Sequence, residues 1–236
     1  QPEPQIYFAR MKRDNKSGAP VLGKLPQPQK LTVAELEAAA DDDETLIVDT
    51  RIDRSAFMEH HIPGALYAPI NKTFNTVVGS LVVDETTPIV LILDEDDVEE
   101  AVRDLVRIGY DNVVGFATHR TLQRYFAQGG ASETIEEISF AEVEARRNDP
   151  NVEVLDVRFR SEYEAGHVPG ARNASYTRLP EYEADIPTDK TLLVHCGSGA
   201  RAAAAAAFLR RTGRSVQLVN DAFENYAEAQ QKPVPA

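Results

Sequence analysis

The hydrophobic positions of the chain fall into short continuous apolar runs, separated by longer stretches with helical spacing. The apolar runs lie at 45–49, 88–93, 112–116, 152–156, 191–195 and 215–219. The stretches with helical character lie at 32–40, 97–108, 139–147 and 199–211. Gly109 and Gly213 follow two of these stretches and have the residue type that commonly ends a helix. Continuous apolar strands that alternate with helices predict an α/β fold with a parallel sheet covered on both faces.

The second half of the chain repeats the order of motifs in the first half. The segment 48–51 (Val-Asp-Thr-Arg) is echoed by 155–158 (Leu-Asp-Val-Arg), 61–65 by 167–171, and the apolar run 89–94 by 191–196. Matches in one order indicate two copies of one domain. We therefore expect two α/β domains at 31–128 and 131–236, each a central parallel sheet flanked by helices. Residues 1–30 are rich in proline and polar residues, and we expect them to form an extended N-terminal arm.

Composition and charge narrow the classes of partner. The 236 residues carry a net charge of −13, which argues against nucleic acid or an anionic membrane as a partner. One cysteine allows no intrachain disulfide, and the five histidines lack the spacing of metal ligands, so we predict no metal site. The chain shows no apolar run of membrane-spanning length and no signal peptide pattern, and we expect a cytoplasmic protein.

The segment 194–201, Val-His-Cys-Gly-Ser-Gly-Ala-Arg, is the strongest candidate for a reactive site. Cys196 follows an apolar strand, at the edge where open α/β sheets bind ligands. We predict that it is the catalytic nucleophile. The loop residues Gly197, Ser198, Gly199 and Ala200 would offer backbone N–H groups to an anion, with Arg201 adding a guanidinium. These features favour the thiolate, which is the attacking species.

Each of these residues also has a plain structural interpretation. A lone cysteine after an apolar strand is usually a small buried hydrophobe, and the Gly-x-Gly-x-Arg continuation is what favours a nucleophile here. Ser198 either donates a hydrogen bond to the bound sulfur or is a turn residue. A cation at Arg201 opposes the helix dipole unless an anion lies beside it. His195 precedes the nucleophile on a strand, so its side chain is expected to point to the opposite face and not to act as a base.

The motifs of the second copy resemble those of the rhodanese family. The resemblance is carried by 156–158 (Asp-Val-Arg), 162–163 (Glu-Tyr), 166–173 and the loop 196–201. It implies a sulfurtransferase in which Cys196 takes sulfane sulfur from thiosulfate or glutathione persulfide, holds it as a persulfide and passes it to a thiophilic acceptor. It also implies that Asp156, Arg158 and 167–173 mainly support the loop, and we expect Arg158 to pair with Glu162 or Glu164.

The length of the loop separates two activities of this family. Phosphatases that resemble this sequence carry five residues between cysteine and arginine, which makes room for a tetrahedral phosphate. Here only four residues lie between Cys196 and Arg201. The shorter loop favours a sulfurtransferase over a phosphatase, which we keep as a distant alternative.

The N-terminal arm carries a second resemblance. Residues 7–15 and 18–22 look like the junction after the catalytic domain of metallo-β-lactamase-fold proteins that end in rhodanese domains, among them persulfide dioxygenases. Those enzymes hold iron or zinc through a His-x-His-x-Asp-His motif, which this chain lacks. The resemblance implies no cofactor in this chain and a possible upstream metallo-β-lactamase-fold domain as partner. A non-catalytic docking or sulfur-relay module for that domain is therefore the alternative function.

The first copy lacks the reactive cysteine. Sequence alignment places Asp94 at the position of Cys196, followed by the acidic residues 95–97. A carboxylate cannot form a persulfide, and acidic groups repel thiosulfate, so we predict that this domain is inactive. We expect Asp97 to cap the following helix. The sequence leaves the sulfur donor, the acceptor and the oligomeric state open.

Overall fold

The computed structural model describes residues 4–18 and 22–231, which form two compact units. The first unit is Pro4–Thr134, and the second begins at Ile135. This border lies slightly beyond residue 131, where we expected the second domain to begin. Glu133 is tied to the first unit by two backbone hydrogen bonds with His61, at 2.8 and 3.1 Å. Below, the two units are called the first and the second domain.

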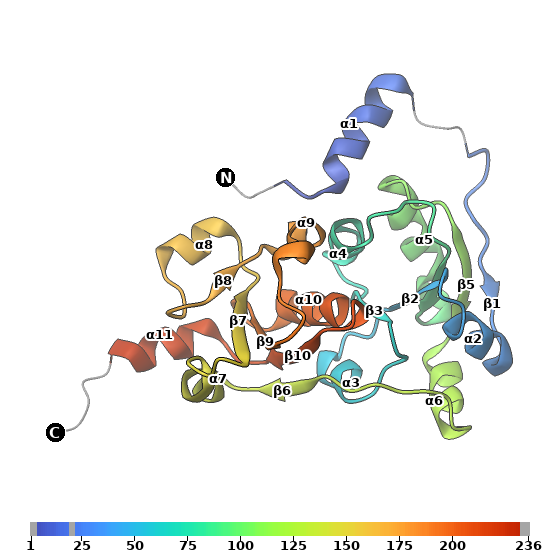
Figure 1. Cartoon of the computed structure of the whole chain (residues 1–236). Coiled ribbons are helices and arrows are strands. Elements are labelled where there is room, and N and C mark those ends of the chain that lie inside the picture. Colours follow the sequence, from blue (N-terminus) through green and yellow to red (C-terminus); the bar gives the residue numbers. More distant parts are fainter. Residues whose placement is uncertain (1–3, 19–21, 232–236) are drawn as a thin grey trace. The chain divides into compact units, whose positions relative to one another are not determined.

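The first domain is built on a five-stranded parallel sheet with the order β1-β5-β4-β2-β3 (Figure 1). Its strands are β1 (Gln29–Lys30), β2 (Leu46–Asp49), β3 (Leu66–Tyr67), β4 (Ile89–Ile92) and β5 (Val113–Ala117). Its helices are α1 (Tyr7–Ser17), α2 (Val33–Ala40), α3 (Arg54–Glu59), α4 (Phe74–Leu81), α5 (Val98–Arg107) and α6 (His119–Ala127), with the 3₁₀ turn η1 (Glu95–Asp97) before α5.

The second domain has the same sheet, with the order β6-β10-β9-β7-β8 and parallel pairing throughout. Its strands are β6 (Glu136–Ile138), β7 (Val152–Asp156), β8 (Arg172–Asn173), β9 (Thr191–His195) and β10 (Ser215–Val219). Its helices are α7 (Phe140–Arg146), α8 (Arg160–Ala165), α9 (Leu179–Tyr182), α10 (Ala200–Arg211) and α11 (Phe223–Gln231), with 3₁₀ turns η2 (Tyr176–Arg178) and η3 (Glu183–Asp185). The equal strand orders confirm the predicted pair of α/β domains.

The first helix after the first strand begins in the same way in both domains. Thr32 and Ser139 accept hydrogen bonds from the backbone N–H groups of Glu35 and Glu142, whose carboxylates accept from the backbone N–H groups of Thr32 and Ser139. These reciprocal bonds satisfy N–H groups that a helix start leaves open. The Ser/Thr-started helices predicted from the sequence therefore form as expected.

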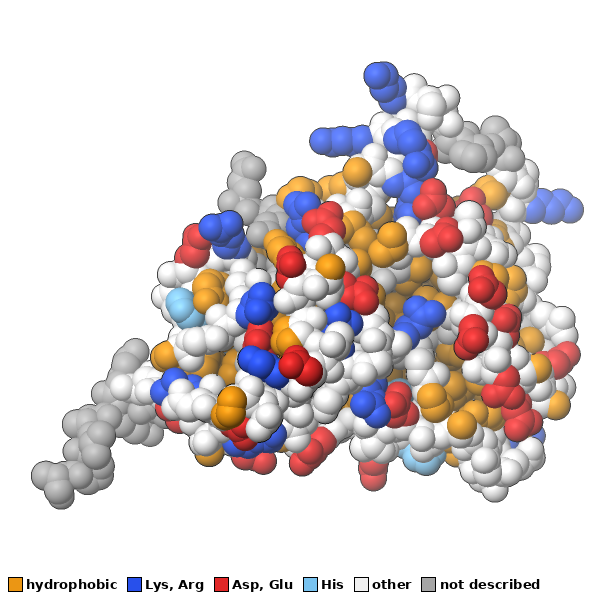
Figure 2. Space-filling model, in the orientation of Figure 1, with side chains coloured by type: hydrophobic (Ala, Val, Ile, Leu, Met, Phe, Trp, Pro, Cys, Tyr) orange, Lys and Arg blue, Asp and Glu red, His pale blue; other side chains and the backbone are white. Residues whose placement is uncertain are grey.

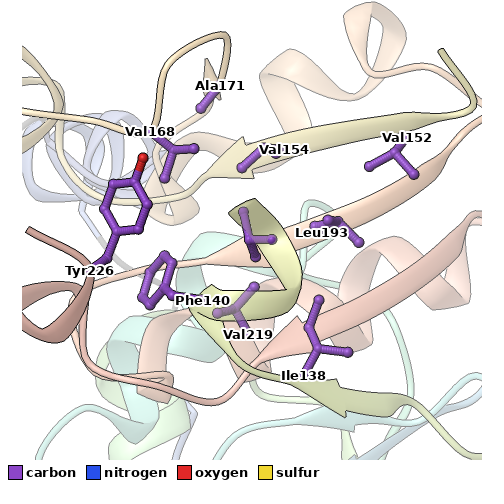
Figure 3. Close-up of a cluster of buried hydrophobic side chains, with 10 residues drawn as sticks. Ile138, Phe140, Val152, Val154, Val168, Ala171, Leu193, Val219 and Tyr226 are labelled. Carbon is purple, nitrogen blue, oxygen red and sulfur yellow. The ribbon is translucent and has the colours of Figure 1, made fainter. Parts of the chain in front are cut away.

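A cluster of buried hydrophobic side chains covers one face of the sheet in the second domain. Val152 and Val154 lie two residues apart on β7, so both side chains lie on the same face of the sheet, in one cluster with Phe140 of α7 and Tyr226 of α11 (Figure 3). The cluster also contains Ile138, Val143, Val168, Ala171, Leu193 and Val219. This packing fixes β7 and β9 in the interior of the sheet, so the loops that follow these two strands start from fixed positions.

Helix α10 packs against β9 and β10. Its residues Ala202–Ala207 are all buried. Six consecutive positions cover the whole circumference of a helix, so α10 is enclosed on every side. Small side chains let such a helix lie close to its neighbours.

The expectation of an extended arm at 1–30 is wrong for part of that segment, since Tyr7–Ser17 forms α1. Arg10 anchors this helix to the first domain: its Nη2 donates to the Ile108 carbonyl at 2.6 Å, and its guanidinium lies 4.5 Å from the centre of the Tyr110 ring. Tyr7 is buried so close to Gly79 that a Cβ there would lie 2.5 Å from the ring. Tertiary contacts therefore stabilise a helix whose start has no side-chain cap.

Charged side chains of both signs lie on the surface shown in Figure 2, with basic ones along α1 and acidic ones gathered around α2 and α5. This distribution agrees with the acidic net charge of the chain. No helix within residues 4–18 and 22–231 is long and apolar enough to cross a membrane.

Candidate active site

Cys196 lies directly after β9, at the carboxyl end of the central strand pair β7–β9. Its side chain is almost completely buried, with 1% of the residue exposed. The loop that follows it is short, because α10 begins at Ala200. Ser198 and Ala200 are exposed, whereas Gly199 is buried. The structure therefore brings all six predicted site residues into one turn between a strand and a helix.

The two glycines of this loop serve different purposes. Gly199 has φ +83°, in the left-handed region that glycine adopts most easily, and it directs the chain into α10. Gly197 does not have a positive φ. A Cβ at Gly197 would lie 3.3 Å from Nη2 of Arg201. Gly199 thus lets the loop turn into α10, while Gly197 makes room for the guanidinium.

Arg201 forms a bidentate ion pair with Glu162 of α8. Its Nη1 donates to Oε2 at 2.6 Å, and its Nη2 donates to Oε1 at 2.7 Å. The hydrogen bonds from Arg201 hold the pKa of Glu162 below its usual range. The hydrogen bonds to Glu162 raise the pKa of Arg201. A cation at a helix start is unfavourable unless an anion lies beside it. For Arg201 this anion is the Glu162 carboxylate.

The predicted partner of Arg158 is wrong. Arg158 does not take Glu162 or Glu164, but forms a bidentate pair with Asp156, two residues before it, with its Nη2 2.6 Å from Oδ2. The same Nη2 donates to the Gly166 carbonyl at 2.7 Å, and the guanidinium lies 3.8 Å from the centre of the Phe223 ring. This buried group links β7, the end of α8 and α11. That Arg158 and Asp156 support the 196–201 loop stays a prediction.

Glu162 is the site residue that the sequence analysis missed. Local spacing suggested a partner four residues away, whereas its actual partner is 39 residues distant along the chain. A signal for this contact existed, since loops after neighbouring parallel strands meet at one edge of the sheet. Glu162 follows β7, and Arg201 follows β9, which pairs with β7.

His195 lies on the opposite side of the strand from Cys196, among aromatic rings. Its ring is 5.3 Å from that of Phe140 and stacks on that of Phe223 at 5.8 Å. Its Nδ1 is 3.4 Å from the Cys196 carbonyl oxygen, and its Nε2 is 3.6 Å from Oδ2 of Asp156. Burial lowers the pKa of His195, so the ring is neutral at neutral pH. This geometry gives His195 a packing role and no access to the thiol.

A cavity of about 510 Å³ adjoins the ion pair. Glu162, His167, Phe223 and Tyr226 are among its lining residues. The Phe223 N–H donates to the Gly197 carbonyl at 3.0 Å, which connects the wall of the cavity to the loop. Solvent reaches the pair from outside, since the side chains of Arg201 and Glu162 are 25% and 35% exposed.

The corresponding turn of the first domain contains a leucine where the second has its cysteine. Asp49 pairs with Ile92, as Asp156 pairs with His195, so the strand registers align Leu93 with Cys196 and Asp94 with Gly197. The sequence alignment that placed Asp94 at the nucleophile position was therefore displaced by one residue. Leu93 is fully buried, whereas Asp94 is exposed and lies 3.3 Å from Nδ1 of His119.

The helix start after this turn also differs from the prediction. Asp97 occupies the N-cap position of α5, but its side chain makes no capping hydrogen bond. Glu99 and Glu100 in the first turn of α5 match the helix dipole. The helix start of the first domain therefore already carries negative charge of its own.

The His, Cys, Asp and Glu side chains of the described residues are the possible metal ligands in this part of the chain. No three His, Cys, Asp or Glu side chains come together there in a way that could hold a metal ion. The residues around Cys196 accordingly offer thiol, guanidinium and carboxylate chemistry.

Two known proteins each match about a third of the chain. The uncharacterised protein YqhL of Bacillus subtilis is 35% identical over 75 residues, which cover 32% of this chain and 60% of YqhL. The HTH-type transcriptional regulator Rv0324 of Mycobacterium tuberculosis is 34% identical over 86 residues, or 36% of this chain and 38% of that protein. Each match spans less than two thirds of the relative.

Among solved structures, SseA of Escherichia coli, described as a 3-mercaptopyruvate sulfotransferase, is 20% identical with a TM-score of 0.36, covering 83% of this chain and 99% of SseA. The family model described as "Rhodanese-like domain" matches the chain twice, at 32–117 and 139–229. These two matches account for most of the sequence. The chain therefore belongs to the rhodanese-like domain family and carries two copies of its domain.

Proposed function

We propose that the second domain is a sulfurtransferase in which Cys196 accepts and donates sulfane sulfur. The observation that carries this proposal is the position of Cys196 at the end of β9, in a four-residue loop closed by Arg201. Arg201 lies at the start of the helix that follows this loop, and a cysteine thiolate is the attacking species in such a transfer. The first turn of α10 adds backbone N–H groups that favour negative charge on a transferred sulfur.

With thiosulfate as donor, the Cys196 thiolate attacks the outer sulfur, and a new sulfur–sulfur bond forms. The bond between the two sulfurs of thiosulfate breaks, and its electron pair leaves with sulfite. With glutathione persulfide the leaving group is the glutathione thiolate. In the second half-reaction a thiophilic acceptor attacks the outer sulfur of the Cys196 persulfide and restores the thiolate.

The size of the site supports sulfur transfer over phosphate transfer. Four residues separate Cys196 from Arg201, and the cysteine is 1% exposed, so the approach to its sulfur is narrow. A single sulfur atom needs less room than a tetrahedral phosphate. We infer that aryl phosphates are not substrates, and phosphate release from them is the measurement that checks this.

The first domain is proposed to be non-catalytic, because it has Leu93 in place of the cysteine. The resemblance of 7–22 to a junction after a metallo-β-lactamase-fold domain supports a longer protein of sulfide metabolism, with the first domain as a docking or relay module. Kinetics of this chain against the full-length protein separate the two functions. Equal and rapid turnover would reject a purely auxiliary role.

The decisive test of the proposed function is the mass of the intact chain after incubation with thiosulfate or glutathione persulfide. We expect an added mass of one sulfur atom on Cys196, which cyanide or sulfite then removes. The Cys196→Ser variant serves as the control. An absent adduct, or one that persists in Cys196→Ser, would overturn the proposal.

A further inference from the structure

In the Arg201–Glu162 pair, some N–H groups of Arg201 remain able to donate hydrogen bonds, but the pair as a whole carries little net positive charge. A guanidinium carries more N–H groups than the two that Glu162 accepts, so donors remain for a ligand near Cys196. The carboxylate, however, offsets the positive charge at a distance below 3 Å. With Cys196 as thiolate, the three groups together carry a net negative charge. A molecule that donates sulfur therefore meets N–H groups that can bind it. The electric field of the three groups, however, repels additional negative charge.

The first domain shows that Glu162 is not required by the fold. Tyr163 stacks on His167 as Phe57 stacks on His61, which aligns Glu162 with Ala56. The buried Asp–Arg pair is kept in both domains, with Arg51 bound to Asp49 as Arg158 is bound to Asp156. The domain without a cysteine thus retains the structural pair and lacks the carboxylate. This contrast assigns Glu162 to the chemistry of the site.

The adjoining cavity borders the pair at Glu162, and neither Cys196 nor Arg201 is among its lining residues. The cavity of about 510 Å³ includes Glu162 in its lining, together with the apolar surfaces of Phe223 and Tyr226. These rings favour an organic group over a small, strongly hydrated anion in the part of the cavity that borders Glu162. The charge of the pair and the aromatic lining of the cavity therefore both favour an organic sulfur donor whose sulfane group carries at most one negative charge.

We propose that Glu162 is a specificity-determining residue that disfavours dianionic sulfur donors such as thiosulfate. It favours organic donors whose sulfane group carries at most one negative charge, such as persulfides. This inference rests on the proposed sulfurtransferase function of Cys196. Glu162 acts through Arg201: it offsets the charge of the guanidinium and fixes its orientation, and it does not take part in the bond-forming step.

The test compares two donors on the same preparations. Thiosulfate is a dianion, whereas benzenethiosulfonate is a monoanion with an apolar ring, and both transfer their outer sulfur to a thiolate with sulfite or benzenesulfinate as leaving group. In Glu162→Gln we expect kcat/KM for thiosulfate to rise relative to benzenethiosulfonate by about tenfold, the effect of one nearby charge on a dianion. A ratio of two rates does not depend on the fraction of folded protein.

Glu164→Gln is the matched control. Glu164 lies on the same helix, is 61% exposed and pairs with Arg160 at 2.8 Å, so its substitution removes the same charge away from Arg201. We expect its donor ratio to equal that of the wild-type chain. A ratio that stays constant in Glu162→Gln, or rises equally in both variants, would overturn the inference. Failure of the sulfurtransferase proposal looks different, since the wild-type chain would then gain no sulfur from either donor.

Discussion

The two domains share one sheet order and one buried Asp–Arg pair, yet they differ at the turn where a sulfur site would lie. The first domain has Ile92 and Leu93 where the second has His195 and Cys196. It also has an alanine in place of Glu162. The buried Asp–Arg pair, which both domains have, belongs to the structure of the sheet and its loops. Cys196 and Glu162, which only the second domain has, belong to the candidate site. The duplicated chain thus contains its own control for separating stability from chemistry.

The largest expected effect comes from moving the thiol between the domains. In the double variant Leu93→Cys with Cys196→Ser we expect sulfur transfer to fall by about 10³-fold or more, because the moved thiol has no guanidinium beside it. Thiocyanate formation from thiosulfate and cyanide measures this. Comparable turnover by the double variant would show that the difference in the turn is not what inactivates the first domain.

The shared Asp–Arg pair should matter to stability in both domains, and more in the second. Arg158→Met leaves the fully buried Asp156 carboxylate unpaired, which costs about 3 kcal/mol of unfolding free energy. Arg51→Met should cost less, since the Arg51 side chain is 17% exposed and that of Arg158 is 6% exposed. Hydrogen exchange of the β2 and β7 amides at increasing urea concentration reports on each domain separately. Equal losses would contradict this ranking.

A smaller effect distinguishes the two loop glycines. Gly199→Ala places a side chain at φ +83° and should cost about 1 kcal/mol of stability. Gly197 corresponds to Asp94 of the first domain, so its backbone accepts a side chain, and Gly197→Ala should leave stability nearly unchanged. Its Cβ would press on Arg201, and we expect a lower kcat/KM. Thermal unfolding and donor kinetics of both variants test this division; a large loss of stability in Gly197→Ala would refute it.

The smallest effect concerns pH. Burial lowers the pKa of His195 from its ordinary value of 6.5. Just below pH 6.5 the ring is therefore neutral in the folded second domain but protonated in the unfolded chain. Stability is therefore full above pH 6.5 and declines as the pH falls from 6.5 towards the folded pKa. His195→Ile, which copies Ile92, should flatten this decline in the second domain.

The first domain provides the internal control for that measurement. Burial lowers the pKa of His61 as well, so the first domain should keep its own decline below pH 6.5 in the His195→Ile variant. Hydrogen exchange at pH 7.5 and 5.5 separates the two domains. An unchanged pH dependence of the second domain in His195→Ile would contradict the role assigned to this histidine.

The regular parts of the fold could be predicted from the sequence because their signals are local. The central strands of both sheets are continuous buried runs, and Thr32 and Ser139 mark helix starts through bonds to residues three positions away. The six residues of the reactive turn are also contiguous, so their juxtaposition followed from the chain itself.

The features that could not be predicted depend on contacts between segments that are distant in the sequence. The helix at Tyr7–Ser17 owes its stability to contacts with residues such as Tyr110, and its own sequence gives no capping signal. The Glu162–Arg201 pair requires knowing that β7 and β9 are neighbours. The equivalence of Leu93 with Cys196 is defined by strand register, which a sequence alignment across a loop of different length cannot supply.

The alanine run of α10 has a genetic consequence. Each residue of Ala202–Ala207 is buried, and single-nucleotide changes of an alanine codon encode mostly larger, charged or helix-breaking residues. A larger or charged side chain there would be forced against the elements around α10, and proline would interrupt the helix that begins beside Arg201. This short stretch of coding sequence is therefore a concentrated target for inactivating mutations, although none of its side chains takes part in the reaction.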